Sequence, residues 1–331
     1  MEHNPKLTCA EVGFLWNHYM ANTMSHCLFM HFLEHVEDKA IGDILTKADS
    51  LSCAIVGYVE RVFLDNGIPL PIGFGEEDVN VKAPRLFSDT FYVMYLEMMI
   101  KLGAIFYAMT MASFSRKDLR EYITKACNNT MILANEITDV MQRKGIYSRP
   151  PQIGLSGTKF VESESFFTGF FGDKRPLAGM EVSQLFSTHQ LNSIKIPLLI
   201  GFSQVAQSQE VKEYFIRGRD YNIKQNRDVM RVLVSEDVPI AIPSQFDITT
   251  STEWTFSDKL MMFHTAQLSS AKVRNFGDSI ALSPRHDLAA LYGKFFLETG
   301  KYAEDGGEIM IRNRWLEMPP HVPDRKALAK Q

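Results

Sequence analysis

The stretch Phe87-Ser88-Asp89 opens a long helical pattern, and the same three residues return as Phe256-Ser257-Asp258 before a second one. These two short matches belong to a much longer internal repeat, in which residues 7–151 line up with residues 177–320. A period of about 170 residues indicates a duplicated domain, because solenoid units repeat every 20–50 residues or so. The sequence therefore predicts two related halves, which we call the first and second repeats.

Few side chains match between the repeats, and those that do are mostly polar residues or prolines. The matches include Glu11 with Glu181, Asn22 with Asn192, Arg61 with Arg231, Pro69 with Pro239, Arg116 with Arg285, and Pro150-Pro151 with Pro319-Pro320. Asp89 and Asp258 also match, in the first turn of one predicted helix, as do Asp118 and Asp287 in another. A carboxylate there meets free backbone N–H groups and the positive end of the helix dipole, so we expect a structural role.

Each repeat divides into four predicted helices whose apolar residues recur at spacings of mostly three or four. In the first repeat these helices span about residues 8–36, 38–65, 91–112 and 115–144. Ser115-Arg-Lys-Asp118 resembles a capping box at the start of the fourth helix. In the second repeat, Pro284 is predicted at the first position of the corresponding helix, where a missing N–H costs nothing. We therefore expect a chain that is helical throughout.

Loop lengths predict how these helices are connected. The first and second helices of each repeat are joined by a short turn, as are the third and fourth, so each pair should be antiparallel. The middle connection, 66–86 in the first repeat and 238–253 in the second, is long enough to run from one end of a bundle to the other. This is the arrangement of ferritin-like bundles. We therefore predict an all-α protein with two tandem four-helix bundles of ferritin-like type, residues 1–152 and 177–331.

Between the two predicted bundles lies an aromatic-rich connector, residues 153–176. It contains Phe166-Phe167-Thr168-Gly169-Phe170-Phe171, and four phenylalanines in six residues would be a liability on an exposed linker. Burying one aromatic side chain contributes roughly 2–3 kcal/mol. We expect this cluster to pack in the seam between the bundles and to fix them as one body.

Composition excludes several classes of protein. A net charge of -4 leaves no basic excess to neutralise phosphates, so nucleic-acid binding is not expected. The four cysteines lie in the first repeat without a Cys-x-x-Cys, which favours reduced thiols in a cytoplasmic protein over a disulfide frame or a zinc site. No basic segment followed by an apolar run opens the sequence, so a secretory signal is not expected. Residues 91–114 are apolar, but Glu97 and Lys101 near their middle favour a buried bundle helix over a transmembrane segment.

Four segments resemble a known bacterial family: residues 8–16, 73–80, 83–89 and 149–151. The family is catalogued as domain of unknown function 3231, and it occurs mainly in endospore-forming bacteria, often as two tandem copies. The resemblance covers the whole chain and is clearer in the first repeat. It implies a ferritin-like helical bundle and a setting in sporulation, in the cytoplasm of the forespore or in the spore. It brings no established activity and no functional residues.

A ferritin-like bundle raises the question of a metal centre. Di-iron and di-manganese bundles use a Glu-x-x-His motif on each of two helices, and the sequence has none. The nearest pattern is His31-Phe-Leu-Glu34-His35, which places two histidines one turn apart and which Glu60 or Glu97 could complete as a site for iron, manganese or zinc. The second repeat has Gly201, Gln204 and Val205 at the matching positions, so any such site is single. The alternative is a pair of ordinary helix histidines.

Glu97 and Lys101 form a second constellation, four residues apart on the most apolar predicted helix. The pair could position a ligand or bring Glu97 near the two histidines, and the alternative is a local ion pair at an interface edge. The same helix is rich in methionine. That composition usually fills irregular core gaps, and less often it lines an adaptable binding surface.

Three functions remain open from these residues. The leading hypothesis is a non-catalytic structural or interaction protein, associated with sporulation, that binds copies of itself or another protein. It predicts no cofactor, and no complete catalytic motif supports an enzyme. The second hypothesis is a divergent metal-binding or redox bundle with one site in the first repeat. The third is a bundle that holds an apolar small ligand around residues 91–112.

Overall fold

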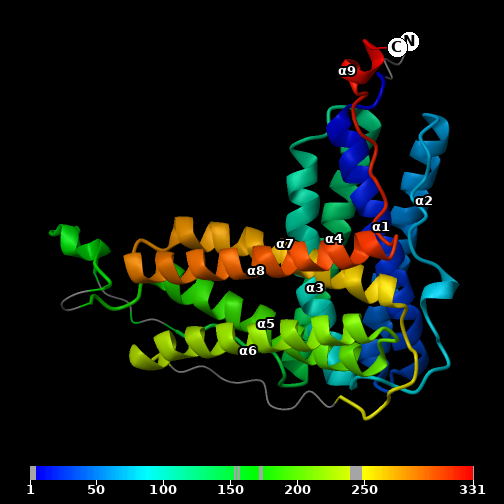
Figure 1. Cartoon of the computed structure of the whole chain (residues 1–331). Coiled ribbons are helices and arrows are strands. Elements are labelled where there is room, and N and C mark those ends of the chain that lie inside the picture. Colours follow the sequence, from blue (N-terminus) through cyan, green and yellow to red (C-terminus); the bar gives the residue numbers. More distant parts are fainter. Residues whose placement is uncertain (1–4, 153, 155–156, 171–173, 239–247, 331) are drawn as a thin grey trace.

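The computed structural model describes residues 5–152, 154, 157–170, 174–238 and 248–330. Eight long helices of 23 to 27 residues dominate this part of the chain, four in each repeat (Figure 1). The first four are α1 (Cys9–His35), α2 (Lys39–Asp65), α3 (Asp89–Met111) and α4 (Lys117–Arg143). The second four are α5 (Gly179–Val205), α6 (Gln209–Ser235), α7 (Asp258–Leu282) and α8 (His286–Arg312). Short helices are η1 (Glu76–Asp78), η2 (Glu164–Phe167) and α9 (Arg325–Leu328). The prediction of two four-helix halves is confirmed.

The connection between α2 and α3 runs the full length of the first bundle, as predicted. Arg116, just before α4, donates to the Asn66 side chain at the end of α2 at 3.0 Å. Asp89, at the start of α3, instead meets the turn between α1 and α2, where it accepts from the Asp38 N–H at 2.7 Å. The end of α2 and the start of α3 therefore lie at opposite ends, and these two helices run parallel. Whether the bundle is of ferritin-like type stays an expectation.

Two predicted helix starts were wrong. Helix α4 begins at Lys117 with Arg116 as its N-cap, and no side chain caps it. The N–H and the hydroxyl of Ser115 both donate to Glu11 on α1, each at 2.9 Å, so Ser115 ties two helices together instead of forming a capping box. Helix α8 begins at His286, so Pro284 precedes the N-cap Arg285 and is not the first helical residue.

The matched acids hold the bundle ends, and in the first repeat Glu11 lies at the centre of this network. It is completely buried and accepts from the backbone N–H groups of Thr8, Ser115 and Arg116 at 2.8 to 3.0 Å. Burial alone would raise the pKa of Glu11, but these hydrogen bonds outweigh it and lower the pKa to about 2. The start of α1 is thus fixed to the start of α4.

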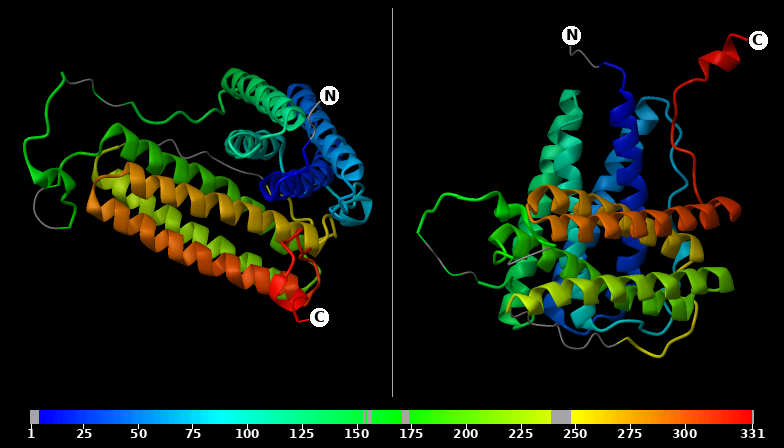
Figure 2. Two further views of the ribbon diagram at one scale, coloured as in Figure 1. Left: turned by 90° about the horizontal axis from the view of Figure 1, so that it is seen from above. Right: turned by 60° about the vertical axis from the view of Figure 1, so that its left-hand side comes forward.

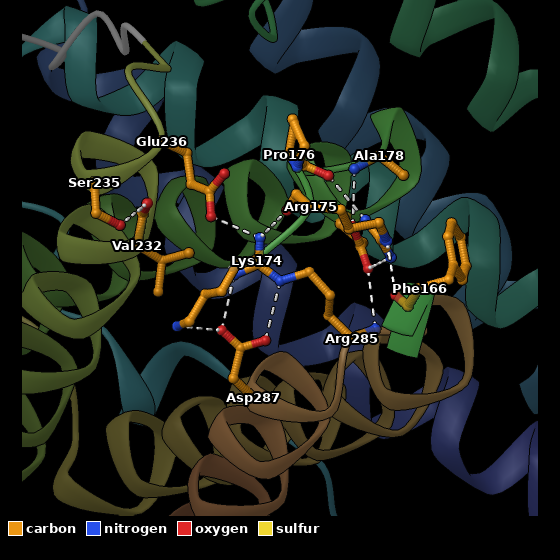
Figure 3. A network of polar contacts seen from close by, with 11 residues as sticks. Phe166, Lys174, Arg175, Pro176, Ala178, Val232, Ser235, Glu236, Arg285 and Asp287 are labelled. Atoms are coloured by element: carbon orange, nitrogen blue, oxygen red, sulfur yellow. Dashed lines mark hydrogen bonds and ion pairs between the residues drawn. The ribbon is translucent and has the colours of Figure 1, made fainter. Parts of the chain in front are cut away.

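The second repeat builds the same clamp with more charge (Figure 3). Glu181 accepts from the Arg285 N–H at 3.2 Å and from the Arg175 guanidinium at 2.7 Å. The buried Arg285 side chain forks onto Asp287 at 2.8 and 3.1 Å and reaches Glu236 at the end of α6 at 2.6 Å. The matched acids therefore have the structural role that we expected. Asp287 pairs with Arg285, the N-cap residue of its own helix, in addition to lying at the positive end of the helix dipole.

The two bundles cross each other and share one hydrophobic core (Figures 1 and 2). At the crossing, the ring of Phe87 lies against Gly201 on α5, while its counterpart Phe256 meets the ring of His31 on α1 with centroids 5.4 Å apart. Gly201 and His31 also occupy matching positions of the repeat. Each repeat therefore inserts the same phenylalanine into the first helix of the other.

The crossing has an approximate two-fold axis. Tyr95 on α3 and His264 on α7 occupy the same position of the repeat, and they hydrogen-bond to each other with Oη and Nε2 2.6 Å apart. The crossover loops pair reciprocally around them: the Asn80 N–H donates to the Thr255 carbonyl at 2.8 Å, and, at the matching positions, the Thr249 N–H donates to the Leu86 carbonyl at 3.0 Å. This is the geometry of an isologous dimer built within one chain.

The aromatic connector does not lie in this seam, so that prediction was wrong. Phe166 packs over the guanidinium of Arg175 at 4.1 Å, and Phe167 stacks on His286 with centroids 6.1 Å apart. These contacts lie at the outer end of the second bundle, and Phe167 and Phe170 remain 46% and 58% exposed. The seam is formed instead by α1, α3, α5 and α7 together with the described parts of the crossover loops. Phe171 lies outside the described residues.

Helix α3 is the one helix in the described ranges that is long and apolar enough to cross a membrane, by length and composition alone. Its residues 91–98 are buried in the shared core, and its second half exposes Ile105, Met109 and Met111. This arrangement agrees with the core helix expected from Glu97 and Lys101.

The crossing yields a stability prediction. A Cβ added at Gly201 would stand 2.4 Å from the Phe87 ring, so Gly201→Ala should lower the free energy of unfolding by about 1–3 kcal/mol. Gly277, inside α7, has no atom within 4 Å of such a Cβ, and Gly277→Ala should stabilise the protein by about 0.4–1 kcal/mol. Urea unfolding of both variants checks this. If Gly201→Ala had the same free energy of unfolding as the wild type, Phe87 would not require a glycine at position 201.

Candidate functional site

A cavity of about 380 Å³ lies where the first bundle meets the second. It opens between α1, α2 and α3 of the first repeat and α7 of the second, and Thr130 of α4 also lines it. Much of its wall is apolar, from Met24, Phe29, Leu51, Leu96, Ile100 and Phe106. The volume is within the range of about 300–1,000 Å³ that is usual for small-molecule sites. The crossing of the bundles therefore creates a pocket that neither bundle would form alone.

Polar groups gather at one part of this wall. His18 is completely buried, with Nδ1 3.1 Å from the Tyr122 hydroxyl and Nε2 3.2 Å from the Thr110 hydroxyl. Burial lowers the pKa of His18 to about 3, so the ring is neutral at physiological pH. Asn22 lies one turn further along α1 and donates to the His18 carbonyl at 2.7 Å and to the Tyr107 hydroxyl at 3.2 Å. This part of the cavity offers neutral hydrogen-bonding groups and no fixed charge.

The second repeat fills the corresponding space with its own side chain. Lys272 matches Gly103 of the first repeat, and its completely enclosed ammonium donates to Asn192, Asn222 and Gln225 at 2.6 to 2.7 Å. Burial lowers the pKa of Lys272 well below its usual value. In the second repeat, three side-chain amide oxygens thus accept hydrogen bonds from a lysine. In the first repeat, the matching residue is glycine, and the space stays open.

A second buried lysine reinforces this difference. Lys195 matches Ser25 of the cavity wall, and its ammonium donates to the Ser269 hydroxyl at 2.9 Å inside the second bundle. Burial lowers the pKa of Lys195 to about 7. Two lysines therefore occupy the second bundle at the two positions where the first repeat has glycine and serine.

A smaller cavity of about 180 Å³ lies on the other side of the approximate axis, between α3 and α5. Glu97 and Lys101 line it and form an ion pair with each other, with Glu97 buried and Lys101 exposed. His189 lines it as well, held by a 2.8 Å contact between its Nδ1 and Asn226. Glu97 and Lys101 thus form a local ion pair that lines this cavity, and a role of the pair in positioning a ligand stays a prediction.

His31 and His35 lie together, with ring centroids 4.5 Å apart. His31 is completely buried; burial and the neighbouring His35 lower its pKa to about 4, against a smaller opposing effect of the Ala83 and Pro84 carbonyls. His31 is therefore a neutral imidazole packed against Phe256.

The three carboxylates predicted for the same metal site lie elsewhere. Glu34 is exposed, Glu97 is paired with Lys101, and Glu60 lies beside Tyr19, which is about 18 Å from His31 along α1. No group of three potential ligands in the described part of the chain includes His31 or His35. These residues do not fit a carboxylate-rich di-iron or di-manganese centre, and metal binding at His31 stays a prediction.

The structure brings together a different set, which the sequence analysis missed: His26 of α1 with Asp49 and Cys53 of α2. His26 Nδ1 lies 2.6 Å from Asp49 Oδ1 and 3.4 Å from Cys53 Sγ. The spacing of four between Asp49 and Cys53 was a possible signal, because it places both on one face of a helix. The third member comes from another helix, so spacing alone could not supply it.

The family model described as "Protein of unknown function (DUF3231)" matches residues 1–157 and matches again over residues 165–328. The chain belongs to this family. Two successive matches place one DUF3231 unit on each repeat, which confirms both the resemblance and the duplication. No curated protein matches the chain.

One solved structure is similar to this DUF3231 protein over a single repeat's worth of chain. It is described as a "putative spore coat protein" from Bacillus halodurans C-125, with 18% identity over 45% of this chain and 98% of that chain, and a TM-score of 0.42. This similarity is too low to inform fold or activity.

Buried His18 predicts a pH dependence. Its pKa is lower in the folded state than the usual 6.5, so the unfolded state takes up the proton first and stability falls as pH drops from about 6.5 towards 3. Between pH 6 and 5, His18→Gln should lose about 1 kcal/mol less free energy of unfolding than the wild type does. Urea unfolding at both pH values measures this. Thr130→Ser, a change in the same wall without a titrating group, should keep the wild-type slope, and an identical slope for His18→Gln would contradict the prediction.

Proposed function

We propose that this DUF3231 protein is a non-catalytic binding protein whose first repeat holds one small, mostly apolar molecule. The observation that carries the proposal is the difference between the repeats at one position. Lys272 fills the interior of the second bundle, while Gly103 faces a cavity of about 380 Å³ in the first. The second repeat shows that the same fold closes this space with its own side chains, so the opening is a property of the first repeat's sequence.

The wall of the cavity favours an apolar body. Methionine, leucine, isoleucine and phenylalanine side chains from four helices line it, and burying apolar surface contributes roughly 25 cal/mol per Å². Neutral hydrogen-bonding groups at Asn22 and Ser52 would orient a ligand, since both are buried and belong to the lining. Among the residues that the structure describes, Arg274 is the one charged side chain in the lining.

Arg274 indicates that the ligand also carries a negative charge. It stands on α7 in the cavity lining, partly exposed, and its guanidinium contacts the Met109 sulfur at 3.5 Å. Within the described ranges it has no carboxylate partner among the ion pairs. A guanidinium free of an acidic partner favours a carboxylate or sulfonate. The ligand class we propose is therefore an apolar body with an anionic end, such as a medium-chain fatty acid.

A structural or interaction role in sporulation remains the proposal for the setting of this binding. The family's occurrence in endospore-forming bacteria supports it, as does the exposed apolar face that Ile105 and Met109, four residues apart, form on α3. Binding and assembly are compatible, because this face adjoins the cavity through Met109 and Arg274. Sedimentation velocity with and without a ligand would show whether the protein self-associates through it.

Filling the cavity tests the binding proposal. Gly103→Leu should abolish saturable binding of 8-anilinonaphthalene-1-sulfonate, an apolar anion, because the added side chain points into the space that Lys272 occupies in the second repeat. Gly57→Leu is the matched control, since Gly57 also lies inside a helix of the first bundle, has no neighbour within 4 Å of a Cβ and does not line the cavity. Fluorescence titration measures both variants. If Gly103→Leu binds the probe as well as the wild type does, the binding site lies elsewhere. If the wild type shows no saturable binding, the proposal of a ligand site in this cavity is refuted.

Removing the positive charge of Arg274 tests whether the ligand has an anionic end. Arg274→Gln should weaken binding of decanoate by about tenfold, equivalent to about 1.4 kcal/mol, and leave decanol binding unchanged. Displacement of the fluorescent probe gives both affinities. Equal loss for acid and alcohol would mean that Arg274 supports the wall and does not recognise charge.

A further inference from the structure

His26, Asp49 and Cys53 present three metal-binding atoms at one point between α1 and α2. Imidazole Nδ1, carboxylate oxygen and thiol sulfur all lie within 4.8 Å of one another. The closest pair, His26 Nδ1 and Asp49 Oδ1, is 2.6 Å apart, and the sulfur is 3.4 Å from the same nitrogen. They come from two antiparallel helices whose packing is fixed at both ends, so their approach does not depend on a loop.

These distances are close to those of a tetrahedral zinc site. Bonds of about 2.0–2.3 Å at tetrahedral angles separate neighbouring ligand atoms by roughly 3.4–3.6 Å. The sulfur–nitrogen pair already has this separation, and the nitrogen–oxygen pair needs to open by about 0.8–1 Å. The His26 and Asp49 side chains are 38% and 20% exposed, which leaves room for that adjustment. His26 is also the partner of Asp49 in its one ion pair within the described ranges, so no lysine or arginine competes for the carboxylate.

We propose that this cluster binds one zinc ion, held by Cys53, His26 and Asp49 with a fourth position open to water. Thiolate and imidazole select zinc over magnesium or calcium, which prefer oxygen ligands. Cys53 is exposed, so the ion reaches the site from solvent. An open fourth position also allows a ligand from a partner or a substrate.

The site belongs to the first repeat alone. Ile196, Arg219 and Ile223 stand at the matching positions of the second repeat, and none of them binds zinc. The proposal is independent of the cavity, since none of the three ligands lines it. Zinc here would cross-link α1 to α2 midway along the bundle, far from the clamps at its ends.

The test uses the full untagged chain, treated with chelator and reductant and then titrated with Zn²⁺ against a competing chromophoric chelator. One equivalent should bind, and Cys53→Ala, Asp49→Asn or His26→Gln should each weaken binding at least about 100-fold, because losing a direct ligand costs more than losing a group that only hydrogen-bonds to a ligand. Cys9→Ala, which removes another exposed thiol, should leave binding unchanged. Substitution with Co²⁺ should give a thiolate charge-transfer band that Cys53→Ala abolishes.

Thermal unfolding keeps the result interpretable if a variant is less stable. Zinc should raise the unfolding temperature of the wild type and of Cys9→Ala but not that of the three ligand variants. Sub-stoichiometric zinc in the wild type would overturn the proposal. So would unchanged affinity in the three ligand variants, or a loss in Cys9→Ala equal to that in Cys53→Ala.

Discussion

The reciprocal insertion of Phe87 and Phe256 is the constraint on which the rest of the structure depends. Each ring enters the first helix of the opposite bundle, and the buried hydrogen bond between Tyr95 and His264 marks the axis that relates them. This crossing joins the parts of the two bundles that meet into one hydrophobic core, while each bundle keeps a second core of its own, and it brings α7 beside α1. Without it, the cavity would lose one of its walls, because part of that wall belongs to the second repeat.

Comparing the two repeats distinguishes residues that the fold requires in both copies from residues that differ between the copies. The clamps at the bundle ends survive in both copies, with Glu11 and Glu181 completely buried at their centres. The interior positions diverged instead: Lys272 closes one bundle and Gly103 opens the other. A protein built this way can keep one repeat closed and diverge in the other, which agrees with finding Gly103 and the three proposed zinc ligands in the first repeat.

Local patterns predicted local structure well, and contacts between distant segments account for the errors. Apolar spacing located α1 and α2 closely, because this signal lies within a few residues. Ser115 and Pro284 misled the prediction because buried Glu11 and Glu181 fix the starts of α4 and α8 from more than 100 residues away. The cavity depends on a bundle crossing that no short pattern encodes. The metal cluster likewise needed His26 from a second helix, and spacing in the sequence does not report such a meeting.

The pair on the axis has an evolutionary consequence. In a dimer of identical chains, the two residues on a two-fold axis are the same, so tyrosine would face tyrosine or histidine would face histidine. Here a hydroxyl meets an imidazole nitrogen 2.6 Å away, a pairing that only two different halves can make. Because both halves belong to one polypeptide, two different residues can meet on the approximate two-fold axis. Neither half can therefore replace the other, because two copies of the same half would not make this contact.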